Sequence, residues 1–206
     1  MTYEINYIHH LNKGLLESKC RINGDQVTLE TFFRELIIKT VAIQRNKGRL
    51  FFFGNGASAS FSNHMALDWS KNGGIIGFSL SDSSMLTALS NDYSYDDAFL
   101  EFLKINSPTS NDLIITTSSS GNSSNIVNVL EYCRNNSLKT FGLSGLNEGN
   151  KTEILSNYSL FVPMKTYGMV ECIHQIFHHL YLDKFMGIQE WNKKESQNMD
   201  SKSFKL

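Results

Sequence analysis

The sequence predicts an α/β fold in which helices cover both faces of a parallel sheet of five strands. Three observations predict it: short apolar runs alternate with amphipathic segments, Gly- and Ser-rich turns separate them, and only 2 prolines interrupt 206 residues. Strands that alternate with helices are typical of βαβ units, which build parallel sheets between two layers of helices. At this length we expect one such domain, preceded by a helical extension.

The extension, residues 1–48, is predicted to hold two helices. Residues 28–45 repeat apolar side chains at three- and four-residue spacing, and Thr28 with Thr31 suits a capped start. Residues 3–18 have the pattern of another helix. Because these helices leave an apolar face that needs covering, we expect them to pack on the domain and on partner subunits.

The sheet domain is expected over residues 49–186. Its strands are predicted at residues 50–53, 75–82, 112–118, 139–145 and 158–163. Its helices are predicted at residues 57–74, 84–106 with a break near Asn91, 124–137, 152–155 and 167–185. The polar tail, residues 187–206, is expected to be poorly ordered.

Charge, cysteine content and hydropathy each make some classes of protein less suitable for this sequence. A formal net charge of −1 with 19% charged residues does not predict a nucleic-acid surface. The sequence has an odd number of irregularly spaced cysteines, Cys20, Cys133 and Cys172, which favours reduced thiols over a disulfide framework. The N-terminus lacks the basic start and apolar core of a signal peptide, and no apolar run approaches the roughly 20 residues of a membrane span. We therefore expect a cytoplasmic protein without a membrane partner.

A cluster of serines follows the third predicted strand, where Ile114–Asn125 reads IITTSSSGNSSN. Ligands of parallel sheets sit beyond the carboxyl ends of the strands. A loop of small residues at a helix start offers main-chain N–H groups, hydroxyl donors and the positive end of the helix dipole. Gly121 lets the backbone approach a ligand closely. The pattern suits a phosphate site, although a Ser-rich turn with a helix N-cap has the same composition.

Residues 54–60, GNGASAS, repeat this arrangement after the first predicted strand. They do not match the GxGxxG dinucleotide loop, because Ala59 occupies the third glycine position. They do not match a Walker loop either, because no GK[ST] follows, so we expect no nucleotide. Two such loops at the ends of separate strands predict a shared pocket for a phosphorylated sugar.

Four motifs together, GNGASAS…HMALD, LTALSNDYSYDDAF, SSSGNSSN and YGMVECIHQIFHH, resemble the sugar-isomerase (SIS) domain proteins and, within them, the phosphoheptose isomerases. The similarity spans about residues 28–185. It implies a flavodoxin-like three-layer sandwich and a homotetramer with active sites between subunits. It also implies interconversion of sedoheptulose 7-phosphate and D-glycero-D-manno-heptose 7-phosphate, on the way to heptose for lipopolysaccharide or capsule.

Matching the motifs residue by residue assigns substrate contacts. The resemblance implies phosphate contacts at Ser118, Ser119, Ser120 and Ser123. It implies contacts with the sugar chain at Asn55 and Ser58, and it places Asp92 and Glu171 at further positions of the pocket. The family's acting pair, a Gln and a His eight residues later, falls on Glu171 and His179.

Moving a proton between neighbouring carbons through an enediol needs a base, an acid and a group that stabilises charge on oxygen. His64 and Asp68 are four residues apart and would share a helix face, about 40° apart. On the closing helix, spacing alone pairs Glu171 with His178, about 20° apart. The resemblance selects His179 instead, so His178 stays a rival for the reactive histidine.

Three positions depart from the family pattern: Asp68 replaces a Glu, Glu171 replaces the Gln, and Met169 replaces an Arg. A carboxylate in place of an amide favours metal binding, and His64, Asp68, Glu171 and His179 form a possible zinc set. We predict that His179 moves the proton between C1 and C2 and that Asp68 moves the hydroxyl protons or acts as a partner base. The lost arginine leaves open which stereoisomer or sugar phosphate is used.

Two other functions fit parts of the sequence. A SIS module that senses a sugar phosphate without converting it, as a regulator or adaptor, needs the serine loops but not the ionisable residues. An oligomeric scaffold would act through its N-terminal helices, and its melting temperature would not respond to sugar phosphates. The ionisable residues favour the isomerase.

Overall fold

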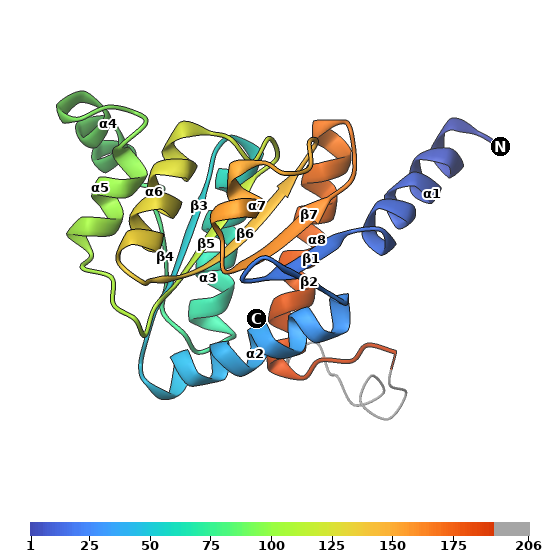
Figure 1. Cartoon of the computed structure of the whole chain (residues 1–206), viewed down its shortest axis with the longest axis horizontal. Helices are drawn as coiled ribbons and strands as arrows, with labels where there is room; N and C mark the ends of the chain where they lie inside the picture. Colours follow the sequence, from blue (N-terminus) through green and yellow to red (C-terminus); the bar gives the residue numbers. More distant parts are fainter. Residues whose placement is uncertain (192–206) are drawn as a thin grey trace.

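A computed structural model describes residues 1–191 as helices layered on a central sheet (Figure 1). The helices are α1 (Tyr3–Leu16), α2 (Leu29–Arg45), α3 (Ala57–Lys71), α4 (Ser83–Asp92), α5 (Ala98–Ile105), α6 (Ser124–Asn135), α7 (Lys151–Leu155) and α8 (Tyr167–Met186). The strands are β1 (Lys19–Ile22), β2 (Asp25–Val27), β3 (Leu50–Gly54), β4 (Gly77–Ser79), β5 (Leu113–Ser118), β6 (Lys139–Gly145) and β7 (Tyr158–Val162). Most of the predicted polar tail, residues 192–206, lies outside the described residues. Within residues 1–191, no helix combines the length and the apolar composition needed to cross a bilayer.

The sheet runs in the order β2-β1-β7-β6-β5-β3-β4. Its strands from β7 to β4 are all parallel to one another. Numbered along the chain, these five strands lie in the spatial order 2-1-3-4-5, which is the flavodoxin-like arrangement. The expected α/β sandwich is therefore confirmed, and the five predicted strands form its parallel part.

The prediction of five strands was incomplete, because the described residues form a sheet of seven. Residues 19–27, expected only to connect two helices, form the antiparallel hairpin β1–β2, and β1 pairs antiparallel with β7. Asn23 and Gly24 turn this hairpin with φ values of 51° and 94°, in the left-handed region that such tight turns require. The Asn-Gly pair was the signal in the sequence for a hairpin that covers the exposed edge of β7.

Two apolar cores lie on the two faces of the sheet. Helices α2, α3 and α8 cover one face, and α4, α5, α6 and α7 cover the other (Figure 1). Alternating side chains of β3 show the division, since Phe52 belongs to the first core whereas Phe51 and Phe53 belong to the second. Because helices cover both faces, a ligand can reach the sheet only at the ends of its strands.

The two N-terminal helices are exposed to different extents. α2 begins at the predicted cap, where Thr28 Oγ1 accepts a hydrogen bond from the Thr31 main-chain N at 3.2 Å. α1 projects away from the sheet (Figure 1) and, although it lies wholly within the described range, it buries only Gly14. Tyr3 and Ile8 are among its exposed apolar side chains. A single chain therefore leaves much of α1 uncovered.

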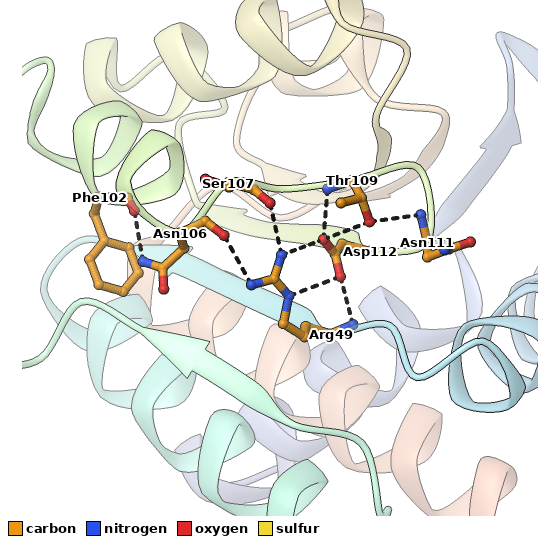
Figure 2. Close-up of polar contacts among 7 residues, drawn as sticks. All are labelled: Arg49, Phe102, Asn106, Ser107, Thr109, Asn111 and Asp112. Atoms are coloured by element: carbon orange, nitrogen blue, oxygen red, sulfur yellow. Dashed lines mark hydrogen bonds and ion pairs between the residues drawn. The ribbon is translucent and has the colours of Figure 1, made fainter.

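An ion pair fastens β3 to β5 at their amino-terminal ends (Figure 2). The guanidinium of Arg49 donates to both carboxylate oxygens of Asp112, at 3.2 and 2.8 Å. It also donates to the main-chain oxygens of Asn106 and Ser107, at 2.9 and 3.0 Å. Burial alone would raise the pKa of Asp112, but the hydrogen bonds from Arg49 and Thr109 outweigh it and hold that pKa below its ordinary value. These amino-terminal ends lie opposite the carboxyl ends of the same strands, where the predicted ligand loops begin.

Candidate active site

The two predicted loops follow β3 and β5, which are neighbours in the sheet. From β3 the chain crosses to β4 on one side, and from β5 it continues to β6 on the other. Such a switch point opens a crevice at the carboxyl ends of the strands, where open α/β sheets bind ligands. Residues 54–60 and 118–124 thus begin at the same crevice.

The serine loop, residues 118–124, is tightly folded. Ser118 and Ser119 are buried, and the hydroxyl oxygens of Ser118 and Ser123 are 3.2 Å apart. Gly121 has a φ of 66°, and its N–H donates to the main-chain oxygen of Ser118 at 2.9 Å. Ser123, the N-cap of α6, makes no capping hydrogen bond through its side chain. Serine hydroxyls and first-turn N–H groups of α6 therefore remain available to an anion.

Helix α7 supports this loop from the side. The main-chain oxygen of Gly121 accepts hydrogen bonds from the N–H and the hydroxyl of Thr152, at 2.9 and 3.0 Å. A Cβ at Gly121 would overlap the side chain of Asn150, so only glycine fits there. Ser120 is half-buried, and its hydroxyl oxygen accepts a hydrogen bond from the Asn122 main-chain N at 3.3 Å. The loop conformation is thus set before any ligand arrives.

Asn55 joins the two loops. Its Nδ2 donates to Asn125 Oδ1 at 2.9 Å, and Asn125 Nδ2 donates back to Asn55 Oδ1 at 3.0 Å. The hydroxyl of Tyr95 donates to the same Asn55 oxygen at 2.8 Å. Ser58 is buried in the first turn of α3. Tyr95 and Asn125 were not among the predicted site residues, although both lie inside the motifs NDYSYDD and SGNSSN.

A second group of polar side chains lies between α3 and α8. We call His64, Asp68 and His179 the α3–α8 cluster, because one ligand atom of each lies within 4.8 Å of the others. His64 Nε2 is 3.2 Å from Asp68 Oδ2, and the rings of His64 and His179 have centroids 5.3 Å apart. Asp183, one turn after His179, has a raised pKa, mainly because of burial and also because of the charges of Glu190 and Asp68, although His179 opposes the shift. Asp183 was not predicted from the sequence.

The donor atoms of the α3–α8 cluster suit a divalent metal ion. Two imidazole nitrogens and a carboxylate oxygen are zinc ligands, and catalytic zinc sites use three protein ligands with an open fourth position. Glu171, the fourth predicted ligand, lies eight residues before His179 on α8. That spacing is about 12 Å along the helix axis, so Glu171 is not part of the cluster within one chain.

The rival histidine is buried against the sheet. His178 Nε2 and Thr117 Oγ1 form a hydrogen bond of 2.9 Å. Burial, assisted by His174 and His179, lowers the pKa of His178 to about 3. His174 Nε2 donates to the main-chain oxygen of Ser144 at 3.1 Å, and burial lowers its pKa to about 4 despite that bond. Both imidazoles are therefore neutral core groups near pH 7, whereas His179 is half-buried.

A groove of about 870 Å³ adjoins His179. Its walls come from α2, α8 and residues 187–191, and they include Phe33, Ile176 and Leu180. The residues of the serine loop are not among those that line it. Asp92 is exposed at the end of α4 and is not among them either. Within one chain, the groove beside His179 is therefore lined neither by the serine loop nor by Asp92.

Comparison with known proteins matches residues 29–145 to the SIS domain family. The phosphoheptose isomerase of Helicobacter pylori (strain ATCC 700392 / 26695) is 32% identical over 182 residues, which cover 84% of this chain and 92% of that protein. The chain belongs to the phosphoheptose isomerase family of SIS-domain proteins. The phosphoheptose isomerase of Aneurinibacillus thermoaerophilus is 30% identical over 181 residues, covering 85% of this chain and 90% of that protein.

Solved structures share the fold of this SIS-domain protein. A phosphoheptose isomerase from Francisella tularensis superposes with a TM-score of 0.75 at 21% identity, covering 91% of this chain and 99% of that one. The SIS match to residues 29–145 contains both loops, His64 and Asp68, whereas His179 follows it on α8. The similarity over 84% of the chain to the curated relative extends beyond that match.

Proposed function

We propose that this protein interconverts the ketose and aldose forms of a sugar phosphate in the cytoplasm. The proposed pair is sedoheptulose 7-phosphate and D-glycero-D-manno-heptose 7-phosphate, a source of heptose for lipopolysaccharide or capsule. Relatives named phosphoheptose isomerase support this substrate class. The observation that carries the proposal of catalysis is the α3–α8 cluster, because a protein that only binds a sugar phosphate needs no close group of titratable side chains.

The serine loop would anchor the phosphate and fix the position of the sugar. Hydroxyl groups and main-chain N–H groups at the start of α6 can bind a phosphate through hydrogen bonds without a cationic side chain. The proposed phosphate contacts are Ser118, Ser119, Ser120 and Ser123, and the proposed sugar contacts are Asn55, Ser58, Asp92 and Glu171.

His179 would carry the proton between C1 and C2. Its ring is half-buried and lines a groove, so a substrate can reach it. Asp68 would move the hydroxyl protons, since its carboxylate lies within 4.8 Å of His179 and is 3.2 Å from His64. His178 is excluded from this role in the proposal because its ring is buried and bonded to Thr117.

His64, Asp68 and His179 would hold a zinc ion, which when bound would polarise the carbonyl of the substrate. An imidazole nitrogen that ligates a metal cannot also accept a proton, so the two roles of His179 are distinguishable by experiment. Glu171 would complete the ligand set only from a second subunit, because of its distance from His179 along α8.

We also propose that the active form is a homotetramer. The serine loop does not line the groove beside His179 within one chain, which supports active sites that combine groups from neighbouring subunits. The uncovered apolar side chains of α1 and the apolar groove beside His179 support close contact between copies.

The proposed function is tested with purified protein and sedoheptulose 7-phosphate in deuterated water. Proton NMR should show aldose formation, with deuterium in place of the C2 proton of the aldose, and the measurement is repeated with a chelator. His179→Ala should lower kcat at least about a hundredfold, which is the usual contribution of a positioned acid–base group. The melting temperature should stay close to that of the wild type, because His179 is not a core residue.

His10→Ala is the matched control, because His10 is exposed on α1 and, among residues 1–191, its ring bonds only to the Asn6 main-chain oxygen of its own helix. Near-normal turnover by His179→Ala would refute the assigned role of His179. Absence of any aldose with the wild type would refute the isomerase. Loss of activity with chelator, restored by zinc, would favour the metal role over the proton-transfer role.

A further inference from the structure

Three sequence motifs meet at one side-chain amide. Asn55 comes from GNGASAS, Asn125 from SSSGNSSN and Tyr95 from NDYSYDD, and three hydrogen bonds between 2.8 and 3.0 Å connect them. Asn125 is 2% exposed, and Tyr95 is 51% exposed. Asn55 therefore has one partner fixed in the core and one partner at the surface of the crevice.

The hydrogen-bonding capacity of Asn55 is almost fully used. A primary amide has two N–H donors and one oxygen that accepts two hydrogen bonds. Both acceptor positions of Asn55 Oδ1 are taken, by Asn125 Nδ2 and by the Tyr95 hydroxyl. One of its N–H groups is donated to Asn125 Oδ1, so a single N–H remains.

The same contacts couple the orientations of two amides. Rotating the Asn55 amide alone by 180° would place its NH2 group against the NH2 group of Asn125, where neither can accept. A matching rotation of the Asn125 amide would restore the pair, and the Tyr95 hydroxyl can accept as well as donate. Either joint orientation therefore leaves Asn55 one free hydrogen-bonding position.

We infer that Tyr95 and Asn125 are positioning residues that hold the Asn55 amide at the carboxyl end of β3 with one free hydrogen-bonding position. The ligand group that meets this position is a hydroxyl of the sugar, which can donate or accept. This inference rests on the proposed function. Because the serine loop is assigned to the phosphate, Tyr95 affects recognition of the sugar part alone.

The test compares Tyr95→Phe with Tyr93→Phe by calorimetry, using sedoheptulose 7-phosphate and inorganic phosphate as separate probes. Tyr93 is the matched control, because it is exposed in the same segment and its hydroxyl makes no hydrogen bond within residues 1–191. Tyr95→Phe should raise the Kd for sedoheptulose 7-phosphate about three- to tenfold, the usual effect of one lost hydrogen bond. Its Kd for inorganic phosphate and its melting temperature should match those of Tyr93→Phe.

A double-mutant cycle separates positioning from direct contact. If Tyr95 acts through Asn55, then Asn55→Ala combined with Tyr95→Phe should bind no more weakly than Asn55→Ala alone. Additive losses, or a Tyr95→Phe protein that behaves like Tyr93→Phe, would overturn the inference and leave the isomerase proposal intact. A wild type that binds inorganic phosphate but no sedoheptulose 7-phosphate would overturn both.

Discussion

Successive side chains on an α-helix point about 100° apart, so the neighbours His178 and His179 of α8 face different surroundings. His178 points to the sheet and shares a hydrogen bond with Thr117, directly before the serine loop. His179 points to α3 and joins His64 and Asp68. The proposal assigns proton transfer to His179 and not to His178, because a fully buried imidazole resists protonation.

We predict that Thr117→Val lowers the free energy of unfolding by about 1–3 kcal/mol, because it leaves His178 Nε2 buried without a partner. Urea denaturation measures the change. Thr116→Val is the matched control, since the buried Thr116 hydroxyl has no hydrogen-bond partner within residues 1–191. Thr117→Val combined with His178→Leu should recover part of the loss. Equal effects at positions 116 and 117 would show that the hydrogen bond contributes little.

At the scale of elements, β3 and β5 are joined at both ends. The Arg49–Asp112 ion pair joins their amino-terminal ends, and the Asn55–Asn125 pair joins the segments that follow their carboxyl ends. The first pair is far from the ligand crevice and therefore bears on stability. The second shapes the crevice and therefore bears on recognition.

We predict that Asp112→Asn lowers the free energy of unfolding by about 2–4 kcal/mol, because Arg49 loses a buried counter-charge. Glu35→Gln removes an exposed ion pair with Arg34 and should cost less than about 1 kcal/mol. The pKa of Asp112 is lowered in the folded protein, so its contribution is present above the unfolded pKa and is lost as the pH falls toward the folded value. Denaturation curves at neutral and acidic pH should therefore differ less for Asp112→Asn than for the wild type.

At the scale of the whole molecule, the single chain leaves two features incomplete. Helix α1 projects away from the sheet (Figure 1), and its apolar side chains Tyr3 and Ile8 are exposed. The serine loop does not line the groove beside His179. Assembly into the proposed tetramer would address both, by covering α1 and by bringing the loop of one subunit toward the α3–α8 cluster of another.

We predict that Ile8→Asp weakens the proposed tetramer and lowers its mass in solution, because it places a charge on an exposed apolar position of α1. Light scattering after size-exclusion chromatography measures the mass. Asn6→Asp is the matched control, since it adds the same charge to α1 about 200° around the helix from Ile8. A tetramer that is unchanged by Ile8→Asp would show that this face of α1 is not part of an interface.

The sequence by itself determined the parallel part of the sheet, its helices and the two loops at the ends of β3 and β5. Local signals were sufficient there: apolar periodicity for the elements, and Gly and Ser where chains turn close to a ligand. The hairpin of residues 19–27 was missed even though Asn23 and Gly24 mark its turn, because its strands are short and half-buried.

Only the tertiary structure decided which ionisable residues meet. His64 and Asp68 are about 110 residues from His179 in the sequence, and the packing of α3 on α8 brings them within 4.8 Å. The same packing leaves Glu171 outside the cluster, because eight helical residues separate it from His179 by about 12 Å. Spacing along a chain fixes which helix face a side chain occupies, but what that face meets depends on burial of apolar surface across the whole domain.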